Sequence, residues 1–345
     1  MQILLAALLA TAAATSAPRY SVIDVGAVAH PGAWSAGIIA LANGKVFGVS
    51  RMRDSPRDNF YWVYDIGSGK AQSLKLPTDD FRPITMNGNS EFLGWRPSVA
   101  GAQALVYRSF GYSQFDNYTE LPDVGQLVTL NESGVVLGNR TINAGLRQTV
   151  PTVSDASGLQ DLPVPGFSAS ARALNNNGLV AGSGQASASA LPMAMVWQDG
   201  VVTDLGGFFP DDMSSAATVV NDNGRVAGRV DGPFRKRSVF LWGPDGMQDL
   251  GRPPGCSHAC TPNGMNNAGQ VVGQARDDSE WAPHYQGWIW QEGTYTPLQD
   301  LVDLPDATIE IPVAIDDQGR IAVGGRPLDR TEGARALLLV PMTSL

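Results

Sequence analysis

Arginine is the residue type best placed to bind a ligand in this sequence, because it recurs at similar positions along the chain. Six arginines each follow a short apolar run by a few residues. They are Arg51, Arg96, Arg140, Arg229, Arg276 and Arg326. A guanidinium presents several N–H donors in one plane, which suits carboxylates and other anionic groups. The sequence therefore predicts an arginine-lined surface for an anionic ligand, such as an acidic polysaccharide or a carboxylate-bearing partner.

Acidic residues near these arginines leave a second interpretation open. Asp54 follows Arg51, and Asp278 follows Arg276. Ion pairs at the surface would then occupy the guanidinium groups, with little gain or loss of stability.

One segment combines an aromatic side chain with a titratable one. His284 lies near Trp281 and Tyr285, in the loop that follows Arg276, which makes this segment the best single candidate for an aromatic contact with a ligand. The whole chain contains only 3 histidines, so a catalytic base or a histidine-rich metal site has few candidates.

Motifs of known enzyme classes are absent from the sequence. It has no His-Glu-x-x-His zinc motif and no Gly-x-Ser-x-Gly nucleophile motif. A pair of carboxylates remains open, because spacing along the chain does not tell which acids face each other in the fold. The Asn- and Asp-rich turns at 221–224 and 316–319 offer oxygen ligands for calcium, but neither continues into a further acidic set that ends in Glu. We therefore expect no metal or other cofactor, with calcium as the open alternative.

The first residues resemble a secretory signal peptide. An apolar run over residues 3–10 is followed by small residues up to residue 16, although the usual basic residue before the run is missing. The run is too short to span a membrane, and no later stretch approaches 18 apolar residues. We expect a signal peptide at 1–16, a secreted or periplasmic mature chain and no membrane span, with an Ala-rich disordered tail as the alternative.

The two cysteines fit this location. Cys256 and Cys260 stand in the segment Cys-Ser-His-Ala-Cys, and an isolated pair in an exported protein is typical of a disulfide. The alternative is a metal held by both thiolates and His258. A tetrahedral site needs a fourth ligand, and none is evident nearby, so we predict the disulfide.

Internal repetition is the strongest signal in the sequence. A turn motif, Asn/Asp-x-x-Gly followed by an alternating apolar run, recurs seven times with its first glycine (or Ser90) at 44, 90, 134, 178, 224, 269 and 319. Asn and Gly at these places predict tight turns between strands. A second glycine inside the following strand, such as Gly228, indicates a neighbour packed too close for a side chain.

Each repeat also contains two further strand signals. One is an apolar strand that ends in an aromatic residue, such as Phe240-Leu241-Trp242, and the other ends in an acid and leucine, such as Asp249-Leu250. We expect the aromatic residues to pack between neighbouring repeats, and each acid to fasten neighbouring repeats together rather than to form a ring of carboxylates. Four short strands in about 46 residues are the content of one β-propeller blade.

The ends of the chain predict how the ring closes. The last repeat lacks its acid-leucine strand, while residues 20–26 match that strand in sequence. We therefore predict an all-β fold: one domain over 17–345, formed as a seven-bladed β-propeller of four-stranded blades, in which the N-terminal strand completes the C-terminal blade.

These motifs resemble those of the extracellular HAF-repeat family of bacterial secreted proteins, over essentially the whole mature chain. The resemblance implies an exported repeat protein and implies no reaction. The family's His-Ala-Phe triplet is replaced here by Met193-Ala194-Met195, Ser238-Val239-Phe240 and Gln286-Gly287-Trp288. No copy keeps the histidine, so no role of that imidazole carries over.

The net charge of the chain limits the classes of partner that it can bind. The formal net charge is −9, which does not suit a general nucleic-acid binder, since that class carries a basic surplus. We predict an exported, non-catalytic binding protein, monomeric, that uses its arginine-bearing loops for an anionic glycan or a protein partner. The alternative is a carbohydrate-active enzyme with a carboxylate pair on the same face.

Overall fold

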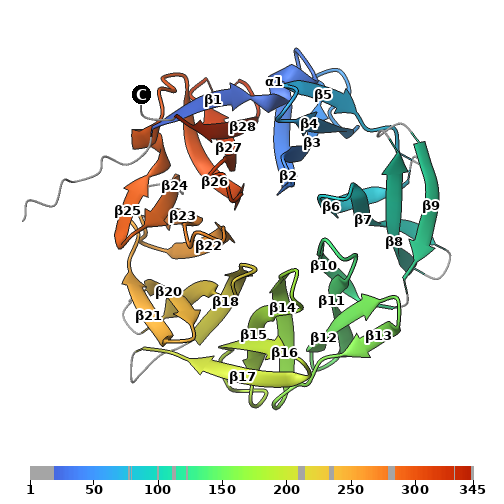
Figure 1. The fold of residues 1–345 in the computed structure, drawn as a ribbon, viewed down its shortest axis with the longest axis vertical. Coiled ribbons are helices and arrows are strands. Elements are labelled where there is room, and N and C mark those ends of the chain that lie inside the picture. The colour runs from blue at the N-terminus through green and yellow to red at the C-terminus, as the bar shows by residue number, and fades with distance from the viewer. Residues whose placement is uncertain are drawn as a thin grey trace, which may run out of the picture.

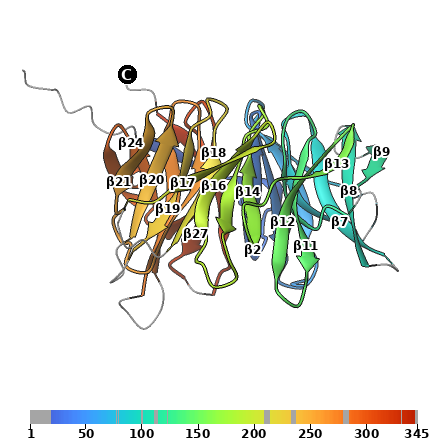
Figure 2. The same cartoon turned by 90° about the horizontal axis from the view of Figure 1, so that it is seen from below.

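The computed structural model describes residues 19–76, 78, 80–98, 101–110, 114–121, 123–208, 214–232, 237–278, 284–329 and 331–342. These residues form seven four-stranded antiparallel sheets arranged in a ring (Figure 1). Seen edge-on, the ring is a disc, and most strands run from one face of it to the other (Figure 2). The predicted seven-bladed β-propeller is therefore confirmed. The predicted signal peptide at 1–16 and Trp281 lie outside the described residues.

The blades follow one another along the chain, and each runs outward from the ring centre (Figure 1). The first three blades are β2 (Ser35–Ala42), β3 (Lys45–Arg51), β4 (Phe60–Asp65) and β5 (Lys70–Ser73); β6 (Arg82–Met86), β7 (Glu91–Ser98), β8 (Gly101–Phe110) and β9 (Gln114–Glu120); and β10 (Gln126–Leu130), β11 (Val136–Asn143), β12 (Gln148–Asp155) and β13 (Gly158–Asp161). The next three are β14 (Ser168–Leu174), β15 (Val180–Gln185), β16 (Met193–Gln198) and β17 (Val201–Gly206); β18 (Ser214–Val220), β19 (Val226–Asp231), β20 (Arg237–Gly243) and β21 (Gly246–Gly251); and β22 (Ala259–Met265), β23 (Val271–Asp277), β24 (His284–Gln291) and β25 (Thr294–Pro297).

The seventh blade joins the two ends of the chain. It consists of β26 (Ala307–Ile315), β27 (Ile321–Pro327), β28 (Arg335–Pro341) and, as its outer edge, β1 (Tyr20–Asp24). The blue β1 lies beside the red β28 in Figure 1, in a register from Tyr20↔Pro341 to Asp24↔Leu337. The predicted closure by the N-terminal strand is confirmed. Two short helices, α1 (Val25–Ala29) and the 3₁₀ helix η2 (Leu298–Leu301), complete the described elements.

The glycine that recurs in the second strands has the predicted structural reason, and in three blades the close neighbour is an aromatic ring on the third strand. Gly48 pairs across the blade with Trp62, Gly228 with Phe240 and Gly273 with Trp288. In each pair the ring lies over the glycine so closely that a Cβ would overlap it. These fully buried rings belong to hydrophobic clusters that join neighbouring blades, so the small residue on one strand makes room for the large one on the next.

The predicted disulfide is confirmed between Cys256 and Cys260, whose Cα atoms lie 5.7 Å apart. Both cysteines are buried and pack in the cluster that contains Trp288. The disulfide closes the segment before β22, and it excludes the alternative in which both thiolates bind a metal. His258, between them, instead forms a pair with Asp278, with 2.9 Å between Nδ1 and Oδ2.

We expect the double substitution Cys256→Ala and Cys260→Ala to lower the free energy of unfolding by about 2 kcal/mol, since the bond closes only a short loop in the unfolded chain. Urea unfolding of the wild type with and without reductant, beside the variant, measures this. The reduced wild type should match the variant. Equal midpoints for the oxidised and reduced wild type would contradict the prediction.

Candidate functional site

The six predicted arginines occupy equivalent places in six blades. All lie within the second strands, and not in the loops after them where the sequence predicted them: Arg51 on β3, Arg96 on β7, Arg140 on β11, Arg229 on β19, Arg276 on β23 and Arg326 on β27. Each of these strands begins near its Asn/Asp turn and runs toward the opposite face of the disc, where the arginine lies in its second half. We call that side the arginine face.

Most of these guanidinium groups contact a carboxylate. The pairs are Arg96–Glu120 at 3.2 Å, Arg140–Asp161, Arg229–Asp231 at 3.1 Å, Arg276–Asp278 at 2.7 Å and Arg326–Glu310 at 3.0 Å. Arg51 instead donates from Nε to Asn59 Oδ1 at 3.0 Å. Positive and negative side chains therefore alternate around the arginine face. An anionic ligand has to bind at one place on this face, because the face is not uniformly cationic.

The acids of the acid-leucine strands correct one expectation. Glu120 and Asp161 were expected to fasten neighbouring blades, but each pairs with an arginine of its own blade. The reason is geometric: the fourth strand pairs with the third strand of its blade, and a long arginine side chain on the second strand reaches across that third strand.

One sector of the arginine face is hollowed. A cavity of about 640 Å³ lies in the seventh blade, next to the start of β24. We call it the blade-seven pocket, and the lining residues that bear on its chemistry are His284, Glu310, Ile311, Arg326, Leu328 and Glu332. Ile311 and Leu328 are large apolar side chains exposed to solvent. Apolar walls, a few convergent polar groups and this volume are usual features of a small-ligand site.

Glu310 and Arg326 form the polar side of this pocket. The Glu310 side chain is only 14% exposed, while that of Arg326 is 59% exposed, and their Oε1 and Nε atoms lie 3.0 Å apart. Burial raises the pKa of Glu310, and the charges of Arg326 and His284 act in the opposite direction. Arg326 uses Nε for this pair, and its two Nη groups have no other partner among the described residues. They remain available as donors to a ligand.

The raised pKa of Glu310 predicts a pH-dependent loss of stability. A carboxyl group whose pKa is higher in the folded than in the unfolded chain stabilises the fold at low pH, and this contribution disappears as the pH rises through the folded-state pKa. We expect Glu310→Gln to unfold at a higher temperature than the wild type at pH 7 and at the same temperature at pH 3.5. Thermal unfolding across this range measures the difference. A gap that widens toward acid would contradict the assignment.

Sequence reasoning located part of this site. Arg326 and His284 were predicted and lie together in the blade-seven pocket, whereas Arg51, Arg96, Arg140, Arg229 and Arg276 belong to other sectors. Arg276 lies with its guanidinium 6.0 Å from the Tyr285 ring centre. Glu310 was missed. Its signal was the single charged residue inside the mostly apolar strand β26.

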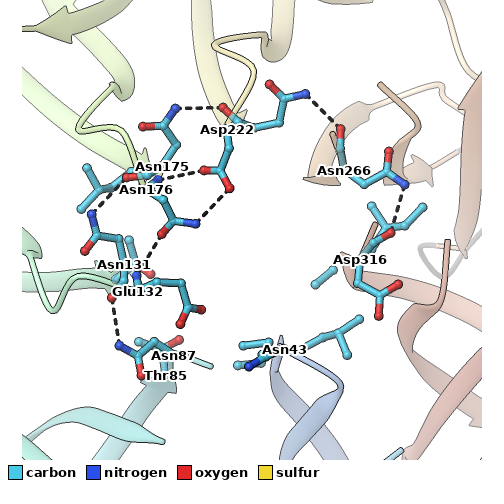
Figure 3. A pocket seen from close by; sticks show the side chains of 18 of the residues that line it. Asn43, Thr85, Asn87, Asn131, Glu132, Asn175, Asn176, Asp222, Asn266 and Asp316 are labelled. Atoms are coloured by element: carbon cyan, nitrogen blue, oxygen red, sulfur yellow. Dashed lines mark hydrogen bonds between the residues drawn. The ribbon is translucent and has the colours of Figure 1, made fainter. Parts of the chain in front are cut away.

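The opposite face carries a ring of asparagines. The turns between first and second strands surround a cavity of about 460 Å³ at this mouth of the ring (Figure 3). Five asparagine side chains each donate from Nδ2 to a backbone carbonyl of the next blade: Asn87 to Asn131 at 2.9 Å, Asn131 to Asn175 at 3.1 Å, Asn175 to Asn221 at 2.9 Å, Asn221 to Asn266 at 3.0 Å and Asn266 to Asp316 at 3.0 Å. We call these residues the asparagine ring. The sequence predicted their turns but not their links between blades.

The same side chains also close their own turns. Asn175 Oδ1, for example, accepts N–H bonds from Asn177 at 3.0 Å and from Leu179 at 2.8 Å. The amide oxygens are therefore engaged by backbone donors, as the hairpin interpretation of these motifs requires. Within the described part of the chain, no group of three or more His, Cys, Asp or Glu side chains is arranged to hold a metal ion.

The ring of seven blades closed by its N-terminal strand defines the class of this protein as a seven-bladed β-propeller. No family model matches its sequence, and no curated protein matches it either. The resemblance to HAF-repeat proteins stays a prediction. No helix among the described residues is long and apolar enough to cross a membrane.

Solved structures share the fold. The chain is similar to the β-propeller domain of the Trilobed protease from Pyrococcus furiosus, with a TM-score of 0.58, 11% identity, and coverage of 89% of this chain and 93% of that one. It is similar to a streptogramin B lyase, with a TM-score of 0.54, 12% identity and coverage of 94% and 98%. For a Pyrococcus horikoshii acylaminoacyl peptidase the TM-score is 0.55 at 11% identity, with coverage of 88% of this chain and 51% of that one. At these identities the likeness shows the fold alone.

Proposed function

We propose that this protein is an exported, non-catalytic binding propeller that holds an anionic ligand, an acidic glycan or an acidic segment of a protein partner, in the blade-seven pocket. One observation carries the proposal: Arg326, whose Nη groups have no protein partner among the described residues, lines a cavity that also has exposed apolar side chains. Bidentate donation from a guanidinium suits a carboxylate, and the apolar walls suit the body of the ligand.

Location and rigidity support the same proposal. A disulfide between the only two cysteines suits an oxidising compartment, in agreement with the predicted signal peptide. The closed ring of sheets fixes the positions of β26 and β27, which carry Glu310 and Arg326, and a preorganised site lowers the entropy lost when a ligand binds.

The test is a thermal-shift and calorimetric titration of the mature chain. The panel contains oligogalacturonates, neutral oligosaccharides of the same length and a poly-glutamate peptide, each at low and high salt. We expect an acidic compound to raise the Tm by binding the native state, with a smaller rise at high salt, and we expect no response to the neutral compounds.

Two arginine variants locate the site. Arg326→Gln should abolish the response, and Arg51→Gln, which removes an exposed arginine of the same face in another blade, should retain it. An equal loss in both variants would indicate general charge attraction and contradict the pocket. No response to any acidic compound would overturn the proposal.

The enzymatic alternative rests on a second carboxylate in the same pocket. Glu332 lines it together with Glu310, and the Glu332 carboxylate lies 3.2 Å from Arg335. A general acid needs a raised pKa, and its partner carboxylate has to stay ionised. The raised pKa of Glu310 suits the first role, and the contact of Glu332 with Arg335 suits the second. Release of reducing ends from a polysaccharide panel, lost in Glu310→Gln, would replace the binding proposal with this one.

A further inference from the structure

A second cavity on the arginine face lies beside the blade-seven pocket. It has a volume of about 500 Å³ and occupies the seam between the seventh and first blades, where β1 and β28 adjoin α1 and the start of β2 (Figure 1). We call it the seam pocket. A cavity of this size is typical of a small-ligand site. The lining residues that bear on its chemistry are Asp24, Trp34, Arg53, Glu332, Gly333, Ala334 and Arg335.

The two pockets meet at one segment of the loop between β27 and β28. Glu332, Gly333 and Ala334 line both cavities. Gly333 N–H donates to Trp34 O at 3.0 Å, which fixes this segment against the first blade. A Cβ at Gly333 would lie 2.5 Å from Ser35 Cβ, so the close approach requires glycine. Because Gly333 and Ala334 have little or no side chain, a long ligand can extend across this segment from one pocket into the other.

Trp34 and Arg53 are held side by side in the seam pocket. Both donate to the carbonyl oxygen of Thr331, with Trp34 Nε1 at 3.3 Å and Arg53 Nη2 at 3.2 Å. Trp34 is nevertheless 38% exposed, and Arg53 makes no other hydrogen bond or ion pair with a described residue. The indole ring therefore has a fixed orientation with part of its surface open to solvent, and the guanidinium group keeps donors for a ligand.

The acids that line the seam pocket are engaged within the protein. Glu332 Oε2 lies 3.2 Å from Arg335 Nη2, and the other Nη group of Arg335 lies 2.7 Å from Asp306 Oδ2. Asp24 accepts a backbone N–H at 2.9 Å and caps α1. Among the described residues of this pocket, the guanidinium group of Arg53 is therefore the charged group that has no ion-pair partner.

An exposed indole beside a guanidinium group suits a particular ligand chemistry. One face of a uronic acid ring presents C–H groups, which pack on an indole, and its carboxylate accepts from a guanidinium group. We propose that the ligand of the arginine face is an acidic polysaccharide that spans both pockets, with one uronate carboxylate on Arg326 and a further sugar ring on Trp34 and Arg53. This assignment rests on the function proposed above. It selects the glycan over an acidic peptide, since a row of carboxylates without rings would leave the indole uncovered.

The experiment is a length series. Galacturonate oligomers from the dimer to the octamer, and glutamate oligomers with the same numbers of carboxylates, are titrated into the mature chain by calorimetry at constant ionic strength. A ligand held in one pocket reaches the other at high effective concentration, so the affinity should rise by about tenfold or more from the galacturonate dimer to the octamer. The glutamate oligomers should gain much less. Equal affinity of the galacturonate dimer and octamer overturns the assignment.

Trp34 variants test the contact in the seam pocket. Trp34→Ala should bind the octamer as weakly as the dimer, and its dimer affinity should equal that of the wild type, because the blade-seven pocket holds the dimer alone. Trp34→Phe, which keeps a ring, should retain most of the gain with length. Trp95→Ala is the matched control, because Trp95 is 39% exposed and lies next to Arg96 on β7 of the second blade. Unchanged octamer binding in Trp34→Ala overturns the assignment.

This assignment and the binding function can fail separately. If the dimer binds, is lost in Arg326→Gln and gains nothing with length, the blade-seven pocket stands and the spanning ligand falls. If glutamate oligomers bind as tightly as galacturonates and depend on Trp34 in the same way, the ligand is an acidic peptide and the glycan falls. If no oligomer of either kind binds, both proposals fall.

Discussion

Replacement of Gly48 by alanine is expected to lower the free energy of unfolding by about 3 kcal/mol, the upper end of the usual range for overpacking a core. A Cβ at this position would lie 2.2 Å from Trp62 Cζ2 and 2.8 Å from the Gly37 carbonyl oxygen. Trp62 is fully buried and its Nε1 donates to Ser50 Oγ at 2.9 Å, so the ring cannot turn away freely. Urea unfolding followed by tryptophan fluorescence measures the loss.

Gly37 supplies the matched control. It lies on the neighbouring strand of the same blade, and a Cβ there would meet no atom within 4 Å. Gly37→Ala should therefore be neutral or slightly stabilising, because it only restricts the unfolded chain. A loss of similar size in both variants would show that backbone freedom, and not the overlap with Trp62, is the reason for glycine at these sites.

A double variant tests the contact itself. Trp62→Leu removes the whole ring that a Cβ at Gly48 would overlap, so the pair of substitutions should cost less than the sum of the two single costs. The seventh blade supports this reasoning, because it has Val323 opposite Leu337 at the equivalent pair. A larger residue is accepted there where the facing side chain is smaller. Additive losses would contradict the complementarity.

The fold was predictable because its determinants are local and repeated. Most blades contain their own turn signal, their own glycine and their own apolar strands, so the repeats predict the same structure independently. The closure was predictable for a similar reason, since Tyr20–Asp24 matches the strand type that the last repeat lacks. The disulfide required only that the two cysteines lie close together in sequence.

The candidate site was less predictable, because its residues break the repeat instead of following it. Glu310 occupies an additional bulge of β26, between Ile309 and Ile311, that the other inner strands do not have. The partners of the arginines could not be assigned either, because a pair such as Arg140–Asp161 depends on a side chain that reaches across the intervening strand.

The first blade shows how one exception compensates for another. Leu41 stands where the other copies have Asn or Asp, so this turn provides no amide to the next blade. Lys45 Nζ reaches the second blade instead and donates to Gly88 O at 3.3 Å and Ser90 Oγ at 3.2 Å. Ser90 is itself the residue that replaces the usual glycine of that turn. Two departures that look unrelated in the sequence therefore form one contact between blades.

The second large effect on stability is expected for a substitution in the asparagine ring. Asn175→Ala should lower the free energy of unfolding by roughly 3 kcal/mol, because unsatisfied buried polar groups cost about 1–3 kcal/mol each. The buried amide of Asn175 accepts from Asn177 N–H and Leu179 N–H, and it donates to Asn221 O at 2.9 Å in the next blade. Chemical denaturation measures the loss. Asn177→Ala, in the same turn, removes only an exposed bond to Asp222 O and should cost well under 1 kcal/mol.

Asn175→Asp separates the two tasks of this side chain. The carboxylate keeps the acceptor that closes the turn but loses the Nδ2 donor to the fifth blade. Asp316 holds the equivalent place in the seventh blade, where its Oδ1 accepts from Gln318 N–H and Arg320 N–H, and its Oδ2 lies 2.6 Å from Arg320 Nε. The fourth blade has Leu179 in place of that arginine. We therefore expect Asn175→Asp to lose stability at neutral pH. Leu179 is buried, so Leu179→Arg has a cost of its own, and the double variant should lose less than the sum of the two single losses. Additive losses would mean that the arginine does not pair with the new carboxylate.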